Sequence, residues 1–354
     1  MVTTTGTQDV SVIDLFCGAG GLSLGLRQAG MKIAAGIDIE ESCRFAYETN
    51  IEAPFLAADV RDVTGEMLNR TWAPGHTRLL AGCAPCQPFS AYRRGADTSR
   101  EASWPLLDEF ARLVEESRPE LVTMENVPRI GSSVVFERFV ASLRSLGYHV
   151  AWEICYGPLF GLPQHRRRLV LLASLLGPID GPAPTNPDAA EVSVRAAIAG
   201  LPPVNAGASD PSDPMHKARG LSAVNLKRIR ASTPGGTWQD WPEDLRAPCH
   251  RKSSGATFRN VYARMTWDDP SPTITTLAHN FGTGRFGHPE QDRAITLREA
   301  AVLQGFPTNY TFVAPGEPIR MSTVGRMIGN AVPPPIARVA GDHLLAHVRE
   351  NHLD

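Results

Sequence analysis

The stretch DLFCGAGGLSLG at residues 14–25 determines the first structural unit that the sequence predicts. It joins an apolar run at 10–16, typical of a buried strand, to a stretch at 22–30 that is typical of a helix. The connection holds three glycines, Gly18, Gly20 and Gly21. Glycines let a backbone turn sharply and come close to a ligand at the start of a helix. The sequence therefore predicts a strand, a ligand-binding loop and a helix, the first unit of an α/β fold.

Strands and helices keep alternating beyond this stretch. Further strand-like runs lie at 31–39, 55–60, 77–83, 121–127 and 168–174. Helices are predicted at 41–50, 104–119 and 136–147. We expect an α/β fold with a doubly wound, mostly parallel sheet, in which ligands bind at the carboxyl ends of the strands.

The composition changes near residue 177, where LLGPIDGPAPTNPDAAE is rich in proline, glycine and aspartate and is typical of a linker. Periodicity is poor from there to about 290, and helices are predicted again at 296–306 and 334–349. We therefore predict two domains. The larger domain comprises 1–178 and is completed by 318–354, and the smaller, loop-rich domain comprises 179–317.

The overall composition is that of a globular protein, with 42% apolar and 20% charged residues in a chain of 354. Apolar runs such as LVLLASLLG at 169–177 are too short to span a bilayer. The N-terminus has neither the basic nor the apolar region of a signal peptide. Six cysteines scattered over this length do not predict a disulfide framework. We expect a cytoplasmic protein with no membrane partner.

The net charge of −2 conceals a basic segment in the second predicted domain. Between His216 and Arg264 there are ten lysines and arginines but three acidic residues, a net charge of +7. Such a segment is typical either of a solvated surface or of a face that binds a polyanion. Composition alone leaves both interpretations open.

The glycine loop and two acidic residues indicate the kind of ligand. The dinucleotide fingerprint G-x-G-x-x-G would need a glycine where Ser23 stands, which disfavours NAD. Asp38 ends the second strand, 20 residues after Gly18, where a carboxylate can accept both ribose hydroxyls of an adenosine. Asp59 ends the third strand, where it could meet an adenine edge. Each acid alone is also typical of a turn or cap. Together they predict a nucleoside cofactor, and S-adenosylmethionine fits because it needs no phosphate cradle.

Residues 82–95, GCAPCQPFSAYRRG, carry Cys83 and Cys86 just after a predicted strand. C-x-x-C is typical of zinc sites and of thioredoxin-like redox pairs. A zinc site would need a second ligand pair, and Cys249-His250 lacks the usual spacing. A redox pair would open a helix, whereas the prolines and polar residues here predict an extended loop. We expect Cys83 to pack at the strand end and Cys86 to be the single working thiol.

Two further polar motifs follow strand ends. Glu125 in MENVP would lie at the same sheet edge as Cys86, although a glutamate there is also typical of a structural ion pair. In QHRRR, alternate residues of an extended segment share a face, so Gln164, Arg166 and Arg168 would project together. A run of arginines is also typical of a solvated surface or a phosphate contact. The alternation favours a shared site.

With these motifs in order, the chain resembles the DNA (cytosine-5) methyltransferases of bacterial restriction–modification systems. DLFCGAGGLSLG resembles the cofactor loop of the family, GCAPCQPFS its Pro-Cys nucleophile loop, ENVP its glutamate motif and QHRRR its Q-x-R-x-R motif. TLREAAVLQGFP and IGNAVPPP are similar to its last motifs. The resemblance covers nearly the whole chain. It implies the S-adenosylmethionine-dependent methyltransferase fold, with 179–317 as the target-recognition domain.

The resemblance also implies the reaction and its residues. A methyl group passes from S-adenosylmethionine, which becomes S-adenosylhomocysteine, to C5 of a cytosine flipped out of a specific double-stranded DNA sequence, through a covalent Cys86–C6 adduct. The implied catalytic residues are Cys86, Glu125, Arg166 and Arg168. The implied cofactor residues are Phe16, Gly18, Gly20, Gly21, Asp38, Ile39, Asp59, Val60, Pro85, Asn330 and Val332. The implied DNA contacts are Gln87, Ser90, Arg93, Arg219, Arg251 and Arg259. No metal is implied.

Other functions have to be weighed against this one. The closest alternative is an RNA (tRNA) cytosine-5 methyltransferase of the same architecture, since the recognition segment and the QPFS loop favour DNA without deciding it. Amino-group DNA methyltransferases carry a (D/N/S)-P-P-(Y/F/W) loop, which the sequence lacks. A silent DNA-binding regulator would not need Cys86, Glu125 and Arg166. We expect a monomer, associated with the nucleoid, that protects host DNA. A cognate restriction endonuclease encoded nearby would be its functional partner.

Overall fold

The computed structural model describes residues 9–85, 105–184, 188, 190–252 and 259–351. The chain forms two compact units. The first unit comprises Met1–Phe160, Arg167–Asp188 and Ala331–Asp354, and the second comprises Gly161–Arg166 and Ala189–Asn330. The functional assignment of 179–317 to target recognition stays a prediction, because the two units are defined by their packing alone.

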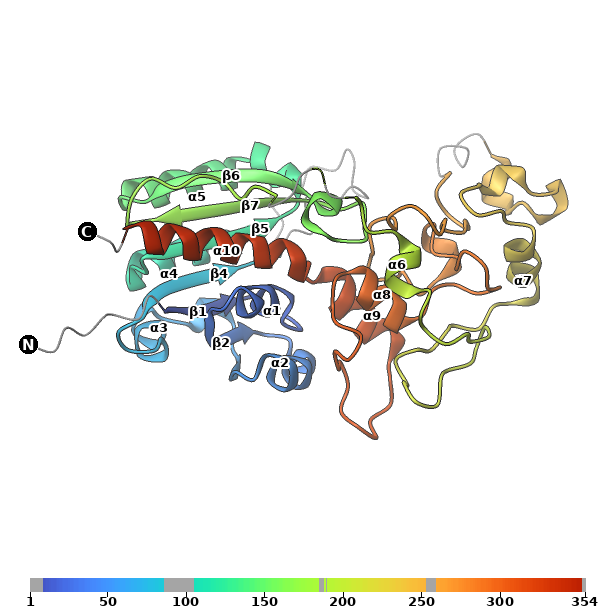
Figure 1. The fold of residues 1–354 in the computed structure, drawn as a ribbon, viewed down its shortest axis with the longest axis horizontal. Helices are drawn as coiled ribbons and strands as arrows, with labels where there is room; N and C mark the ends of the chain where they lie inside the picture. Colours follow the sequence, from blue (N-terminus) through green and yellow to red (C-terminus); the bar gives the residue numbers. More distant parts are fainter. Residues whose placement is uncertain (1–8, 86–104, 185–187, 189, 253–258, 352–354) are drawn as a thin grey trace, which may run out of the picture. The chain divides into compact units, whose positions relative to one another are not determined.

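The first unit is built on a sheet that has seven strands among the described residues (Figure 1). The strands are β1 (Val10–Leu15), β2 (Lys32–Asp38), β3 (Phe55–Ala57), β4 (Thr77–Gly82), β5 (Leu121–Asn126), β6 (His149–Tyr156) and β7 (Arg167–Ser174). Their spatial order is β3-β2-β1-β4-β5-β7-β6. Strands β1 to β5 are parallel to one another, and β7 runs antiparallel to both β5 and β6. The prediction of a doubly wound, mostly parallel sheet is confirmed.

Strand β6 was not predicted from the sequence. It pairs with β7 along its whole length, from His149 opposite Ser174 to Tyr156 opposite Arg167. Its residues Trp152, Glu153 and Ile154 are all exposed, so the strand lacks the alternation of apolar and polar residues that marks a half-buried strand. An edge strand has only one neighbour, and its side chains are less strictly divided between core and solvent.

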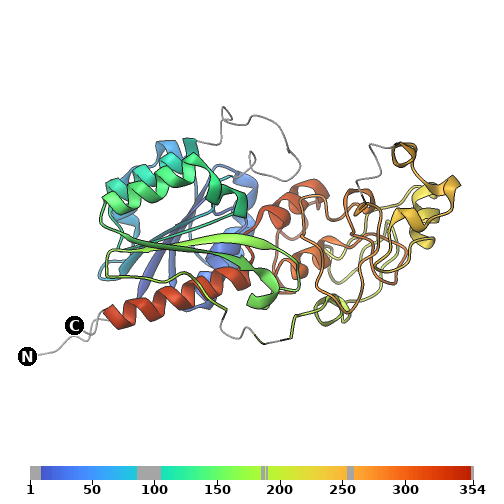
Figure 2. The same cartoon turned by 90° about the horizontal axis from the view of Figure 1, so that it is seen from above.

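Helices cover both faces of the sheet, as Figures 1 and 2 show. On one face α1 (Gly21–Gln28) packs against α2 (Arg44–Ile51) and α10 (Pro334–Asn351). On the other face α4 (Pro105–Ser117) lies between α3 (Gly65–Thr71) and α5 (Val134–Ser145). A Cβ atom at Gly25 would lie 2.4 Å from Ala337 Cβ, so this glycine lets α1 and α10 approach closely. The C-terminal helix thereby returns the chain to the glycine loop at the start of α1.

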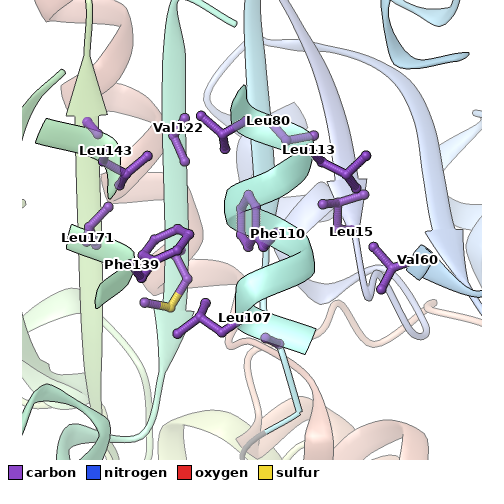
Figure 3. Packing of buried hydrophobic residues seen from close by; sticks show 14 of the residues in the cluster. Leu15, Val60, Leu80, Leu107, Phe110, Leu113, Val122, Phe139, Leu143 and Leu171 are labelled. Carbon is purple, nitrogen blue, oxygen red and sulfur yellow. The ribbon is translucent and has the colours of Figure 1, made fainter. Parts of the chain in front are cut away.

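The hydrophobic core of the first unit lies between the sheet and helices α4 and α5 (Figure 3). Leu107, Phe110 and Leu113 of α4 recur at helical spacing and are buried. The ring of Phe110 packs on Phe139 of α5, with 5.4 Å between ring centroids. Complete burial of a side chain of this size stabilises a fold by roughly 1.5–3 kcal/mol. This packing fixes the strands whose carboxyl ends carry the candidate site.

The second unit consists of short helices and irregular segments, as its poor periodicity predicts. Its α-helices are α6 (Val194–Ile198), α7 (Ala223–Arg230), α8 (Leu297–Leu303) and α9 (Met321–Asn330). The described 3-10 helices of the two units are η1 (Glu41–Cys43), η2 (Val60–Asp62), η5 (Pro128–Ser132), η6 (Gly157–Phe160), η7 (Trp238–Asp240), η8 (Glu243–Leu245), η9 (Pro248–Arg251) and η11 (Phe281–Thr283).

A small aromatic cluster and a buried ion pair hold the second unit together. The cluster contains Trp238, Trp241 and Phe281. In the ion pair, Arg293 donates one hydrogen bond to each carboxylate oxygen of Glu299, both at 2.7 Å. A unit with little regular structure thus relies on specific polar contacts as well as on apolar burial.

Candidate active site

The glycine loop between β1 and α1 has an unusual backbone. Phe16, Gly18 and Gly20 have φ angles of 58°, 52° and 89°, all in the left-handed region. This region costs a non-glycine residue roughly 1–3 kcal/mol, so Phe16 is strained where the glycines are not. At Gly21 a Cβ atom would lie 2.3 Å from the carbonyl oxygen of Val332. The loop therefore has a defined shape, and part of it is packed against the segment that precedes α10.

Asp38, at the end of β2, is tied to this loop. Its Oδ2 accepts a hydrogen bond from the backbone N–H of Gly18, and its Oδ1 accepts one from the N–H of Glu40, both at 2.8 Å. Burial raises the pKa of the Asp38 carboxyl group. Each carboxylate oxygen has a second lone pair, so the side chain can also accept a hydroxyl group of a ligand.

Asp59, after β3, makes a local contact instead. Its Oδ1 accepts a hydrogen bond from the N–H of Arg61, and its carboxylate pairs with the Arg61 guanidinium group. The hydrogen bonds from Arg61 lower the pKa of Asp59 to about 2. Asp59 caps η2, the alternative that the sequence leaves open, and its predicted contact with adenine stays a prediction. Two apolar residues flank these acids: Ile39 is 70% exposed and Val60 is buried.

A buried acid beside the glycine loop was missed by the sequence analysis. Asp14 Oδ2 accepts a hydrogen bond of 2.6 Å from Ser23 Oγ, which also lies 2.8 Å from the hydroxyl oxygen of Tyr47. The other oxygen, Oδ1, has no hydrogen-bond partner among the described residues. Burial raises the pKa of Asp14 to about 7, against the opposing effect of the Ser23 hydrogen bond. The available signal was Ser23, a polar residue where the dinucleotide fingerprint has glycine.

Glu125 is placed by the pairing of β4 with β5. The register sets Gly82 beside Met124, which brings the next residues, Cys83 and Glu125, level with each other. Cys83 Sγ donates a hydrogen bond to Glu125 Oε2 at 3.1 Å. The neighbouring Asn126 donates from Nδ2 to the carbonyl oxygen of Ala84 at 3.0 Å. Two contacts therefore fix the end of β5 to the segment that leads toward Cys86.

The second oxygen of Glu125 faces an arginine. Oε1 lies 2.9 Å from Arg168 Nε, and the two side chains are 5% and 14% exposed. Oε1 accepts no directed hydrogen bond among the described residues, so this contact is an ion pair. The structure therefore brings Glu125 and Arg168 together.

Gln164 and Arg166 are bound within the second unit. Gln164 Nε2 donates to the carbonyl oxygen of Leu303 at 3.0 Å. Arg166 donates to the carbonyl oxygens of Ile274, at 2.9 Å, and Gly329, at 3.2 Å. Both side chains are buried whereas Arg167 is exposed, so burial alternates as expected for an extended segment. The predicted contact of Arg166 with the target base stays a prediction.

The remaining predicted residues fall into two groups. Cys86, Gln87, Ser90 and Arg93 lie outside the described residues. The others are described: Arg219, Arg251, Arg259, Pro85 and Asn330 are exposed, and Val332 is buried. Arg219 Nη1 donates to Asn280 Oδ1 at 2.6 Å, and Arg251 Nη2 donates to the carbonyl oxygen of Glu243 at 2.9 Å. None of these contacts by itself shows a role in DNA binding.

Comparison with known proteins shows the family to which the chain belongs. Residues 10–346, nearly the whole chain, match the family model of C-5 cytosine-specific DNA methylases. The chain belongs to this family. The predicted resemblance is therefore confirmed.

Individual relatives support the same conclusion for this methylase. It is 47% identical over 332 residues to the Type II methylase M.HgiDII of Herpetosiphon aurantiacus, covering 93% of each chain. It is 30% identical to the Type II methyltransferase M.Eco47II of Escherichia coli, covering 96% of this chain and 80% of that one. The crystal structure of a putative DNA modification methyltransferase from an Escherichia coli prophage has the same fold, with a TM-score of 0.72, 22% identity and coverage of 97% and 100%.

The protein is thus a cytosine-5 DNA methyltransferase of the Type II restriction–modification kind, with the fold of S-adenosylmethionine-dependent methyltransferases. The hydrogen bond from Cys83 to Glu125 was not predicted, because the sequence analysis expected Cys83 only to pack at the strand end.

Among the described residues, none of the helices has the length and apolar character needed to cross a membrane. Within those same ranges, no cluster of three His, Cys, Asp or Glu side chains is arranged to bind a metal ion.

Proposed function

We propose that this methylase acts on a flipped-out cytosine in a specific sequence of double-stranded DNA, through a covalent bond between Cys86 Sγ and cytosine C6. The observation that carries the proposal is the position of Glu125. It is a buried acid at the carboxyl end of β5, ion-paired with Arg168 and fixed by Cys83 and Asn126 to the segment that leads toward Cys86.

The residues suit the chemistry that cytosine demands. C5 is a poor nucleophile, and a thiolate that adds to C6 turns the ring into an enamine. As the Cys86 thiolate adds, the C5=C6 electrons move toward C4 and the C4=N3 electrons move to N3, which takes a proton from Glu125. Arg168 stabilises the carboxylate that this transfer leaves behind. Arg166 is assigned to the O2 side of the base.

The reaction ends with restoration of the aromatic ring. Once C5 carries the methyl group, it loses its proton to a base and the Cys86 thiolate leaves, which re-forms the C5=C6 bond. N3 returns its proton to the Glu125 carboxylate and so restores the acid. Because these atoms are inaccessible in a stacked duplex, the cytosine has to leave the helix before reaction. Gln87, Ser90 and Arg93 would contact the opened DNA.

The residues around the glycine loop fit S-adenosylmethionine. The exposed side chain of Ile39 and the strained Phe16 offer apolar contacts for an adenine ring. Asp38 has lone pairs left for ribose hydroxyls, and Asp59 is assigned to the adenine amine. The backbone at Gly18, Gly20 and Gly21 lines the rest of the site, with Val60, Pro85, Asn330 and Val332 as further contacts. When bound, S-adenosylmethionine supplies the methyl group and becomes S-adenosylhomocysteine.

The biological role follows from the Type II relatives. We assign target recognition to 179–317, whose basic segment His216–Arg264 carries a net charge of +7. Arg219, Arg251 and Arg259 are its assigned DNA contacts. The methylase would act as a cytoplasmic monomer that protects host DNA from a cognate restriction endonuclease.

The test uses tritiated methyl transfer with duplex DNA and with tRNA as substrates, for the wild type and for Cys86→Ser. Wild-type protein should label DNA, and bisulfite sequencing should place the product at C5 in one sequence context. Cys86→Ser should bind S-adenosylmethionine in calorimetry but transfer no methyl group, and it should not trap 5-fluorocytosine DNA. Cys249→Ser, at an exposed cysteine, is the matched control and should remain active. Full activity of Cys86→Ser would refute the covalent mechanism, and labelling of tRNA alone would refute the DNA substrate.

A further inference from the structure

We propose that Cys83 is a positioning residue for the methyl-transfer reaction, whose thiol stabilises the Glu125 carboxylate as it forms. The inference rests on the proposed function, because it requires Glu125 to be the acid at cytosine N3. It gives a role to the first cysteine of the C-x-x-C motif, which neither a metal site nor a redox pair explains.

The fold places the thiol where this role requires it. Cys83 directly follows β4 and Glu125 is the penultimate residue of β5, and the parallel register of these adjacent strands sets the two residues side by side. The Sγ–Oε2 distance of 3.1 Å is short for a hydrogen bond donated by sulfur. Glu125 is buried and Cys83 is partly buried, so solvent only weakly screens the interaction.

The two oxygens of Glu125 have different surroundings. Cys83 occupies Oε2 with a directed hydrogen bond, whereas Oε1 faces Arg168 in an ion pair without one. Because Oε1 accepts no hydrogen bond among the described residues, its lone pairs are more available than those of Oε2. Oε1 is therefore the oxygen assigned to exchange a proton with the base.

The thiol contributes most after the proton has left. In the proposed step, Cys83 donates to a neutral oxygen for as long as Glu125 holds the proton that it gives to N3. When the proton moves to N3, the same S–H group donates to a carboxylate, and hydrogen bonds to charged acceptors are stronger than those to neutral ones. An interaction that strengthens along the reaction lowers the barrier of the chemical step without tightening substrate binding.

This contact also argues against a nucleophilic role for Cys83. A carboxylate beside a thiol disfavours the thiolate, which is the reactive form of cysteine. The two cysteines of the motif therefore have different tasks. Cys86 supplies the nucleophile, and Cys83 keeps its proton and donates it as a hydrogen bond.

The test compares Cys83→Ala with Cys83→Ser in single-turnover methyl transfer at saturating DNA and S-adenosylmethionine. A hydrogen bond with a net contribution of about 1 kcal/mol corresponds to a loss of roughly fivefold in rate for Cys83→Ala. Cys83→Ser retains a donor and should stay within about twofold of the wild type. The KM values for DNA and for S-adenosylmethionine should not change. Tritium release from DNA labelled at cytosine C5 reports the same rate independently of the methyl count.

Two further variants separate the possible failures. Cys155→Ala removes a buried thiol from the edge strand β6, which β7 separates from β5, and should lower the melting temperature without a fall in rate. In a Glu125→Gln background, Cys83→Ala should cause no additional loss. A wild-type rate for Cys83→Ala, while Glu125→Gln is inactive, overturns the inference alone. A rate loss that Cys83→Ser does not rescue also overturns it, since a purely structural role would give that result. Full activity of Glu125→Gln overturns the proposed acid itself.

Discussion

Replacement of Asp14 by asparagine should stabilise the protein at neutral and alkaline pH, although it removes an ionisable group next to the glycine loop. Asp14 is completely buried and is the penultimate residue of β1, next to the glycine loop. One carboxylate oxygen accepts a hydrogen bond from Ser23, and the other has no hydrogen-bond partner among the described residues. Asparagine keeps the shape and an acceptor for Ser23 but never carries the charge that burial disfavours.

The size of the effect follows from the pKa of Asp14, which burial raises to about 7. An unfolded aspartate has a pKa of about 3.9, so the folded protein holds this proton more tightly over about three pH units. The contribution of Asp14 to the free energy of unfolding is therefore greatest below pH ~4 and falls as the pH rises toward 7. At about 1.4 kcal/mol per unit, the total loss approaches 4 kcal/mol.

The assay is urea denaturation of wild type and Asp14→Asn at several pH values between 5 and 8. The difference in free energy of unfolding should move in favour of the variant by about 2–3 kcal/mol over this range and level off above pH ~7. Asp62→Asn, at an exposed aspartate of η2, is the control for loss of a carboxylate. If asparagine packs less well than aspartate, this lowers the free energy of unfolding of the variant by the same amount at every pH. The pH dependence of the difference between variant and wild type is then unchanged.

The result that would refute this reasoning is a difference that stays constant from pH 5 to pH 8. It would mean that Asp14 has the same charge in the folded and unfolded protein throughout, so that burial does not hold its proton. A difference that moves in favour of the wild type with rising pH would show that the carboxylate form is stabilised by a contact not seen in the structure.

Three further variants test other parts of the molecule. Glu125→Gln should slow methyl transfer by about 10²–10⁴-fold, the usual contribution of a general acid, and a loss under threefold in single-turnover assays contradicts its role. Glu299→Gln leaves the guanidinium group of Arg293, 1% exposed, without its carboxylate and should lower the free energy of unfolding by about 3–5 kcal/mol. Burial alone would raise the pKa of Glu299, but the hydrogen bonds from Arg293 outweigh it and the pKa is lowered. The contribution of the Glu299–Arg293 pair to the free energy of unfolding should therefore be present at neutral pH and lost as the pH falls below about 4. Urea titrations in which this contribution persists at acid pH would contradict the expectation. Gly21→Ala places a Cβ atom 2.3 Å from the Val332 carbonyl oxygen and should destabilise the protein by about 1–3 kcal/mol, whereas an unchanged melting temperature would show that the loop yields.

Most of the fold could be predicted because short-range patterns specify it. The apolar run that became β1, the glycine loop and the helix after it are each set by neighbouring residues. The 20-residue spacing from Gly18 to Asp38 correctly indicated that the second strand ends beside the loop, since Asp38 accepts a hydrogen bond from the Gly18 N–H. Adjacent parallel strands place their ends together whatever their sequences are, and this brought Glu125 to the expected edge.

The missed features depend on contacts between distant parts of the chain. Nothing near Cys83 in the sequence reveals that its thiol meets Glu125, because the pairing register of β4 and β5 decides it. Asp59 shows the opposite case, where a purely local contact with Arg61 satisfies a side chain that the sequence could equally assign to a ligand. Strand β6 was not predicted because some of its apolar residues are exposed, so the sequence lacks the alternation of apolar and polar residues that marks a half-buried strand.

Three unfavourable features of the first unit lie at one edge of its sheet, although left-handed backbone also occurs elsewhere in the unit, at Glu52 and Arg118. The left-handed Phe16, the buried Asp14 and the buried Glu125 all lie at the carboxyl ends of β1 and β5. Phe16 costs roughly 1–3 kcal/mol and Asp14 as much as about 4 kcal/mol above pH 7, a large share of the 5–15 kcal/mol by which domains are usually stable. Close packing of α4 and α5 on the sheet offsets these costs. Since a sequence optimised for stability alone would discard all three, their common location supports the proposal that this edge carries the reaction.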